Sequence, residues 1–264
     1  MATLLFSACG PKTPKVLVLY YSQTDHTRTV AQEIQKALGA DIEEVLCVNP
    51  YDGTYQETVN RAGEERAKGI FPELEPIKAD LSQYDIIFLG YPVWYGTISL
   101  PMAGLVEKVD FAGKKLVPFC TFGSGGLDSS VRDLEKELPT AEILPGYGVR
   151  TARIEAAPAE VDRFLKEYGY IAGEYTKPGP FGEEHAVSEE ESAIFDTAVA
   201  GYPMINAKAE KVCMRDVEGG KEYFFTARDL PRPDANPDAP APGTIKVYVL
   251  ALDGETPVFT QVLR

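Results

Sequence analysis

Between Lys15 and Tyr168 the chain alternates short apolar runs with longer amphipathic segments, and this alternation restricts the possible folds most. The apolar runs are predicted strands, at 15–21, 41–48, 84–89, 115–121 and 142–144. Predicted helices lie at 26–38, 55–68, 101–109, 128–138 and 158–168. Strands separated by helices favour a parallel sheet with helices on both faces. Residues 15–170 are therefore predicted to form one α/β domain.

The composition changes after residue 170. Residues 171–187 are rich in Gly, Pro and charged side chains and are interpreted as a linker. A helix is predicted at 188–201, because Ser188 can cap it and three glutamates follow in its first turn. No helix separates the strands predicted after it, at 207–217, 221–229, 244–252 and 257–263, with a proline-rich loop at 231–242. Residues 218–220 and 253–256 are typical hairpin turns, which predicts that the strands on either side of each pair. Residues 188–264 thus predict a small α+β domain with an antiparallel sheet.

Charge and composition exclude several classes of function. The 264 residues carry a net charge of −14, which argues against nucleic acid as a partner and suits solubility or a basic protein partner. The four cysteines and two histidines have no zinc-type spacing, so no metal site is predicted. Cys47 and Cys120 lie in apolar runs and are predicted to be buried free thiols. The sequence has neither a P-loop nor a Ser-His-Asp arrangement, and no catalytic residue is assigned.

The first fourteen residues resemble a truncated bacterial lipoprotein signal followed by a linker. An apolar stretch from Leu4 leads through small residues to Cys9, the position that would receive lipid. The stretch has no basic residues before it and is short for a signal. Two locations follow as alternatives: the bacterial cell envelope, with a lipid anchor at Cys9, or the cytoplasm. No other stretch is long and apolar enough to span a membrane.

Residues 15–30 predict an anion site. The first strand ends in a cluster of hydroxyl side chains, Ser22, Thr24 and Thr27, and a helix follows at once. Free backbone N–H groups and the positive end of the helix dipole favour a phosphate at such a point. An ordinary helix cap is the alternative interpretation.

Two further loops follow the third and fourth predicted strands. The first contains Trp94 and Tyr95, and the second contains three glycines between Gly123 and Gly126. In an open α/β sheet, ligands bind beyond the carboxyl ends of the strands at the topological switch point, where these loops should meet. The combination predicts a site for a flat ring with a phosphate tail. Partly buried aromatic residues and a flexible glycine turn are the alternatives.

The three loops resemble those of the flavodoxin family. Residues 22–27 are similar to its Ser/Thr-x-Thr-Gly-x-Thr phosphate loop, and residues 92–97 and 121–126 are similar to its second and third flavin loops. The resemblance implies a doubly wound five-stranded parallel sheet of order 2-1-3-4-5 and bound FMN. The cofactor-binding residues that it implies are Ser22, Gln23, Thr24, Asp25, His26, Thr27, Pro92, Val93, Trp94, Tyr95, Gly96, Thr97, Thr121, Phe122, Gly123, Ser124, Gly125 and Gly126.

Each loop has an implied role in that resemblance. The hydroxyls of the first loop would bind the phosphate, and Trp94 or Tyr95 would stack on the isoalloxazine ring. The backbone of Gly123–Gly126 would approach the flavin edge, where side chains would clash.

Asp25 departs from the family pattern, which has glycine at this position. A carboxylate beside a phosphate is unfavourable, and the turn can require a positive φ that Asp tolerates less well than Gly. Either Asp25 points outward or caps the helix, with His26 and Arg28 offsetting its charge, or the flavin site has decayed.

The C-terminal part resembles the cystatin-like fold, in which a helix precedes a four-stranded sheet. Residues 216–223 are similar to the cystatin hairpin at Val217, Gly220 and Tyr223, whereas Asp216 replaces its leading Gln. The resemblance implies a fold, and protease inhibition is kept only as a third hypothesis.

Two principal hypotheses follow. The first is an FMN-dependent redox protein, either an electron carrier with a redox protein partner or a reductase of a quinone-type acceptor. The second is a non-catalytic cell-envelope binding module with a degenerate flavin site.

Overall fold

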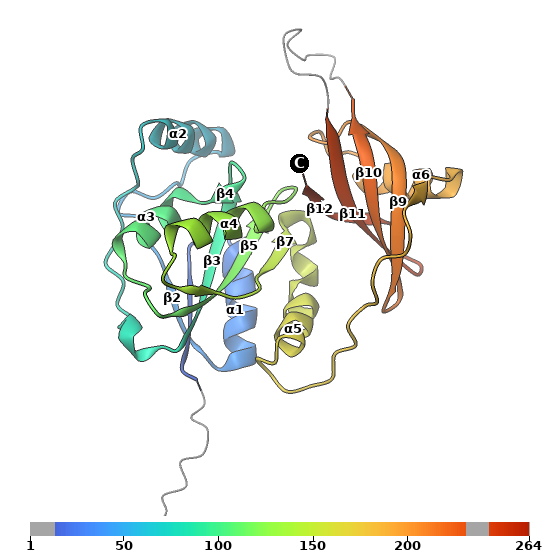
Figure 1. The fold of residues 1–264 in the computed structure, drawn as a ribbon. Helices are drawn as coiled ribbons and strands as arrows, with labels where there is room; N and C mark the ends of the chain where they lie inside the picture. Colours follow the sequence, from blue (N-terminus) through green and yellow to red (C-terminus); the bar gives the residue numbers. More distant parts are fainter. Residues whose placement is uncertain (1–13, 231–242, 264) are drawn as a thin grey trace, which may run out of the picture. The chain divides into compact units, whose positions relative to one another are not determined.

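The computed structural model describes residues 14–230 and 243–263 (Figure 1). The predicted signal with Cys9 and the proline-rich loop 231–242 lie outside the described residues. The chain divides into two compact units, and each is described by itself. The first runs to Tyr91 and adds Ile98–Phe119 and Val131–Tyr147. The second contains Pro92–Thr97, Cys120–Ser130 and the chain from Gly148 onward.

The α/β part is built on one sheet in the order β2-β1-β3-β5-β6, with β4 paired to β3 and β7 paired to β5. Its strands are β1 (Val16–Tyr20), β2 (Asp41–Glu44), β3 (Ile86–Trp94), β4 (Thr97–Ile98), β5 (Lys115–Phe122), β6 (Glu142–Ile143) and β7 (Tyr147–Arg150). β1 pairs in parallel with β2 and β3, and β5 pairs in parallel with β6. The predicted five-stranded order 2-1-3-4-5 is confirmed, with the short strands β4 and β7 added.

Helices separate the strands, as the alternation predicts. They are α1 (His26–Leu38), α2 (Tyr55–Ala67), α3 (Leu100–Lys108), α4 (Leu127–Glu137) and α5 (Ala157–Glu167), with short 3₁₀ helices η1 (Leu81–Gln83) and η2 (Thr151–Ala156). α1 packs on β1 and β2 through its buried stripe of Val30, Ala31 and Ile34. It ends at Gly39, whose φ of 61° is the left-handed conformation that glycine adopts without strain.

Two strands end more than two residues away from the prediction. β2 ends at Glu44 and not at residue 48, because the chain then leaves the sheet edge and pairs with residues 73–75. β3 continues to Trp94, although Gly90 suggested a loop after Leu89. Gly90 keeps its register with Tyr20, and a Cβ there would lie 2.1 Å from the Phe119 ring. Gly90 therefore makes room for a core aromatic and does not end the strand.

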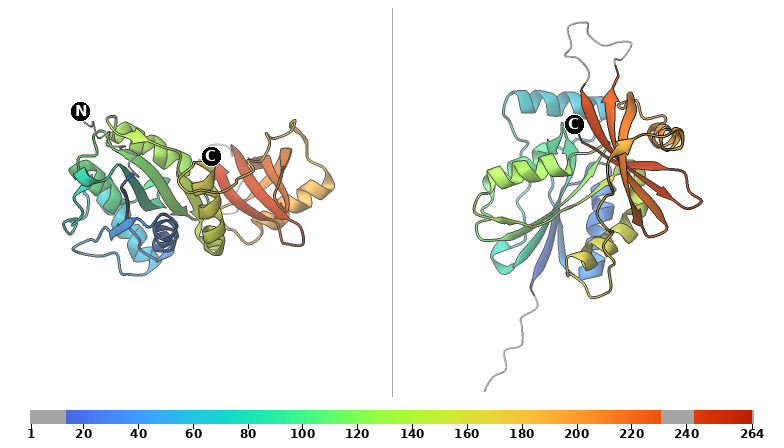
Figure 2. Two further views of the ribbon diagram at one scale, coloured as in Figure 1. Left: turned by 90° about the horizontal axis from the view of Figure 1, so that it is seen from below. Right: turned by 45° about the vertical axis from the view of Figure 1, so that its right-hand side comes forward.

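The C-terminal part forms a separate antiparallel sheet of order β12-β11-β10-β9-β8, with helix α6 (Glu189–Val199) (Figure 2). The strands are β8 (His185–Ala186), β9 (Ala207–Val217), β10 (Gly220–Asp229), β11 (Thr244–Leu252) and β12 (Val258–Leu263). The predicted hairpins β9–β10 and β11–β12 and the α+β class are confirmed. β8 lies within the segment interpreted as a linker and pairs with β9. The cystatin likeness remains a resemblance.

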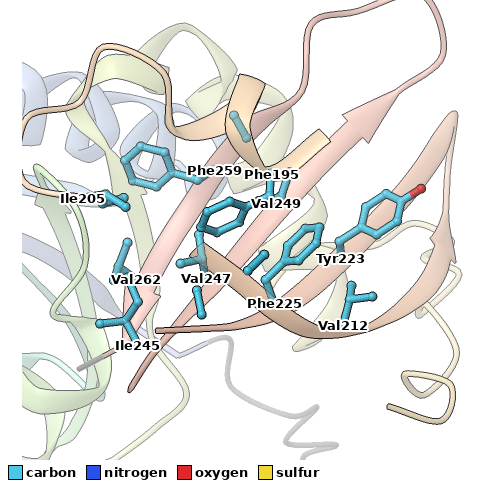
Figure 3. Close-up of a cluster of buried hydrophobic side chains, with 13 residues drawn as sticks. Phe195, Ile205, Val212, Tyr223, Phe225, Ile245, Val247, Val249, Phe259 and Val262 are labelled. Carbon is cyan, nitrogen blue, oxygen red and sulfur yellow. The ribbon is translucent and has the colours of Figure 1, made fainter. Parts of the chain in front are cut away.

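Aromatic side chains cover both faces of this sheet. On one face, Phe195 of α6 packs against Phe225 with ring centroids 5.2 Å apart, among the buried residues in Figure 3. On the other face, Phe181 contacts Phe224 and Tyr248, with centroids 5.9 and 6.1 Å from its own. The segment before β8 thus supplies part of the hydrophobic cover of the sheet.

The described residues contain no helix long and apolar enough to cross a bilayer, and no cluster of His, Cys, Asp and Glu suited to a metal ion. Cys120 is buried, as predicted, whereas Cys47 is only partly buried. Burial raises the pKa of both thiols, that of Cys47 to about 11, so both remain protonated at neutral pH.

Candidate functional site

The loop after β1 is held in place by side chains on both of its sides. The Ser22 Oγ accepts a hydrogen bond from the Arg28 backbone N–H at 3.2 Å, which fastens the loop to α1. The Gln23 Nε2 donates to the Thr58 Oγ1 at 2.8 Å and to the Tyr51 carbonyl at 3.3 Å. Thr27 is buried in the first turn of α1. The loop therefore has a fixed shape.

Three backbone N–H groups of this loop are available to an anion. Within the described part of the chain, the N–H groups of Gln23, Thr24 and Asp25 donate no hydrogen bond. They precede the positive end of the 13-residue helix α1. The Thr24 hydroxyl and the His26 Nδ1 lie 2.9 Å apart and share a hydrogen bond. Such a set of N–H groups is what a phosphate requires.

Asp25 has a left-handed backbone conformation, which glycine adopts more readily than other residues. Its φ is 61° and its ψ is −7°, so the expected positive φ is confirmed. The Asp25 side chain is 73% exposed and makes no capping hydrogen bond. Of the two predicted orientations, it therefore has the outward one and does not cap the helix. Its carboxylate forms an ion pair with the Arg28 guanidinium, as predicted, whereas His26 pairs with Thr24.

Arg28 has a second acidic partner that the sequence did not indicate. Its Nη2 donates to both carboxylate oxygens of Glu44, at 2.8 and 2.9 Å. The Glu44 hydrogen bonds raise the pKa of Arg28 above its ordinary value, so the side chain is a permanent cation. Glu44 comes from the end of β2, the strand that pairs with β1. The guanidinium is thereby fixed beside Asp25 and offsets its charge.

The second loop is a tight two-residue turn. Pro92, Val93 and Trp94 end β3, Thr97 begins β4, and only Tyr95 and Gly96 lie between the strands. Tyr95 has φ 52° and Gly96 has φ 77°, the two successive positive values of a type I′ hairpin turn. Positive φ is costly for an aromatic residue, and strain of this kind concentrates at functional sites. The Tyr95 side chain is 52% exposed, and Trp94 is partly buried.

The third loop follows β5 and is formed by small residues. Thr121 and Phe122 are buried at the end of β5, and Gly123–Gly126 lead into α4. Gly126 has φ 127°, and a Cβ there would lie 2.5 Å from the Val93 Cγ1. This position therefore requires glycine for its backbone conformation and for its space.

The second and third loops are joined to each other. The Ser129 hydroxyl, in the first turn of α4, donates to the Gly96 carbonyl at 2.6 Å. Together with the Gly126–Val93 contact, this bond ties the hairpin turn to the glycine loop. Ser129 was not recognised from the sequence, because a single serine in a helix gives no signal of its partner.

The three loops follow β1, β3 and β5, which are consecutive neighbours in the sheet order. They begin where these strands end, at the edge at which open α/β sheets bind ligands. A loop with free N–H groups before a helix, an aromatic hairpin and a glycine loop, in this order along neighbouring strands, are the arrangement of the flavodoxin class.

Comparison with known proteins gives the family. The flavodoxin family model matches residues 15–162, and the chain belongs to this family. A structure from Bacteroides uniformis, named as a flavoprotein, is 25% identical with a TM-score of 0.51 and covers 57% of this chain and 99% of its own. A second, from Bacteroides eggerthii, is 26% identical with a TM-score of 0.49 and covers 56% of this chain and 96% of its own.

A third similar structure is a flavoprotein from Lactobacillus acidophilus in complex with FMN. It is 22% identical with a TM-score of 0.48, and it covers 58% of this chain and 99% of its own.

Proposed function

We propose that this chain binds FMN at the three loops and serves as a flavin-dependent redox protein. The observation that carries the proposal is the Asp25–Arg28–Glu44 arrangement, because Asp25 was the residue least compatible with a phosphate. Asp25 has the positive φ that the turn needs, and its exposed carboxylate is partly offset by Arg28, which it shares with Glu44. The departure from the family pattern is therefore compatible with FMN.

The residues present suit each part of the cofactor. The N–H groups of residues 23–25 and the hydroxyls of Ser22, Thr24 and Thr27 would hold the phosphate. Trp94 or Tyr95 would stack on the ring, and the backbone of Gly123–Gly126 would lie along its edge. When bound, FMN supplies the redox chemistry, and the protein's part is to hold, orient and shield the ring.

A direct test is the absorbance spectrum of the full chain after saturation with FMN and desalting. Retained absorbance of bound flavin, at one FMN per chain, is the expected result. A protein that leaves the column without flavin would refute the proposal. Ser22→Ala with Thr24→Val, which removes two of the phosphate-facing hydroxyls, should weaken retention and serves as the matched variant.

The acceptor is proposed to be a redox protein partner, with a quinone-type acceptor as the second candidate. The acidic net charge of −14 favours docking to a basic partner. One assay separates the two: oxidation of NADH or NADPH by the FMN-loaded chain with a quinone present. Turnover would establish a quinone reductase, whereas its absence together with electron exchange with a protein partner would establish a carrier.

A further inference from the structure

The glycine loop and the C-terminal sheet belong to one compact unit, and backbone contacts join them. The Val262 N–H of β12 donates to the Ser124 carbonyl at 2.7 Å. A Cβ at Gly125 would lie 2.4 Å from the Val262 carbonyl oxygen, so only glycine allows this approach. β12 is the edge strand of its sheet, and its outward N–H is satisfied by the loop.

Arg150, at the end of β7, reinforces the same junction. Its Nε donates to the Gly123 carbonyl at 2.9 Å, and its Nη1 donates to the Phe259 carbonyl of β12 at 2.8 Å. Its guanidinium carbon lies 3.2 Å from the centroid of the Phe259 ring and 5.3 Å from that of Tyr202. One side chain thus bonds the first residue of the glycine loop and the C-terminal strand together.

This arginine is unusual for a buried cation. It is 7% exposed, and among the described residues its neighbours are two carbonyls, two aromatic rings and no carboxylate. Burial lowers the pKa of Arg150 to about 10, which still leaves it charged at neutral pH. A buried cation without an acidic partner is costly, and a purely structural link would not need one.

We propose that Arg150 is a positioning residue that, together with Val262, fixes the loop Gly123–Gly126 in the conformation that receives the flavin. The C-terminal domain then sets the affinity of a site built on the flavodoxin part of the chain. The proposal rests on the FMN binding proposed above. Because such coupling is reciprocal, bound FMN also stabilises the junction between the loop and β12.

The test uses the full chain and pairs of matched variants. Val262→Pro removes the N–H that bonds Ser124, and proline is tolerated at an edge strand where the N–H points outward. Val262→Ala keeps that N–H but removes two buried methyl groups, so it shows the effect of lost packing alone. Arg150→Met removes the guanidinium, Arg150→Lys keeps the charge, and Arg228→Met breaks an exposed ion pair with Glu210 elsewhere in the same sheet as the control.

Two measurements are made on each variant: hydrogen exchange of residues 120–130 in the flavin-free protein, and the FMN dissociation constant from flavin fluorescence. Val262→Pro and Arg150→Met should each accelerate exchange and raise the dissociation constant by about tenfold or more, as expected for a lost bond to a charged or buried group. Val262→Ala and Arg228→Met should change the exchange rate and the dissociation constant much less. Arg150→Lys should give values between those of Arg150→Met and the wild type.

The inference would be overturned if Val262→Pro and Arg150→Met showed the same exchange rates and FMN affinity as the controls. A wild-type chain that binds no FMN would instead refute the proposed function. In that case the exchange measurement alone would still decide whether Arg150 and Val262 fix the loop.

Discussion

At the scale of single residues, Asp25 holds the loop after β1 in a conformation that glycine would adopt without cost. A non-glycine residue in the left-handed region loses ~1 kcal/mol, although Asp tolerates it better than most. Asp25→Gly removes that cost and a negative charge, and it frees Arg28 from one of its partners. We expect the lost charge to lower the FMN dissociation constant by about three- to tenfold, measured by quenching of flavin fluorescence. The relieved strain stabilises the flavin-free and the FMN-bound protein alike.

Asp25→Asn separates the effect of the negative charge from the effect of the backbone conformation. Asn also tolerates positive φ but carries no charge. If the Asn variant gains as much affinity as the Gly variant, the carboxylate is the source of the effect. An unchanged dissociation constant in both variants would show that Arg28 already neutralises Asp25 completely.

His185 gives a prediction about pH. The hydrogen bond from its Nε2 to the Glu191 Oε1, at 2.9 Å, raises the pKa of His185. A raised pKa in the folded state means that the pair stabilises the fold below the unfolded pKa of about 6.5, and that this stabilisation is lost as pH rises through the folded value. His185→Gln should therefore lower the urea midpoint at pH 5.5 and not at pH 8.5.

The control for this prediction is the same substitution in a Glu191→Gln background. Without the carboxylate, His185→Gln should have no pH-dependent effect, as a double-mutant cycle requires. An equal loss of stability at both pH values would show that His185 acts by packing and not by its charge.

At the scale of elements, the β3–β4 hairpin combines a favourable turn type with an unfavourable residue. Type I′ turns favour Asn or Asp at the first position, where this chain has Tyr95 with φ 52°. Tyr95→Asn should raise the thermal midpoint of the flavin-free protein by a few degrees, since it relieves ~1 kcal/mol of strain. The same change should weaken FMN binding, because the aromatic ring is lost.

Tyr95→Phe is the matched variant, because it keeps both the ring and the strain. It should change neither the thermal midpoint nor the affinity appreciably. Calorimetry and flavin titration on the two variants check the prediction, and a Tyr95→Asn protein that is no more stable than the wild type would contradict it.

The elements also show what could be predicted from sequence. Helix α1 was predicted at the observed residues, because its apolar stripe and the glycine after it are local signals. The end of β3 was missed, because Gly90 resembles a strand breaker until the ring of Phe119 is placed against it. Arg150 was missed for a similar reason: its partners, Gly123 and Phe259, lie far from it in the chain.

At the scale of the whole molecule, the charge of −14 bears on the proposed exchange of electrons with a protein partner. Two proteins of opposite charge associate faster because their electric fields steer the encounter. Salt weakens this steering, since at 0.1 M charges more than ~10 Å apart are largely screened from each other. If the partner is a basic redox protein, the second-order rate constant for electron transfer from the reduced, FMN-loaded chain to a basic c-type cytochrome should fall by about tenfold or more between 10 and 300 mM salt. Stopped-flow absorbance measures this rate.

A small neutral quinone provides the control, because its reduction involves no steering and should hardly depend on salt. A cytochrome rate that is equally insensitive to salt would show that the acidic surface serves solubility and not docking.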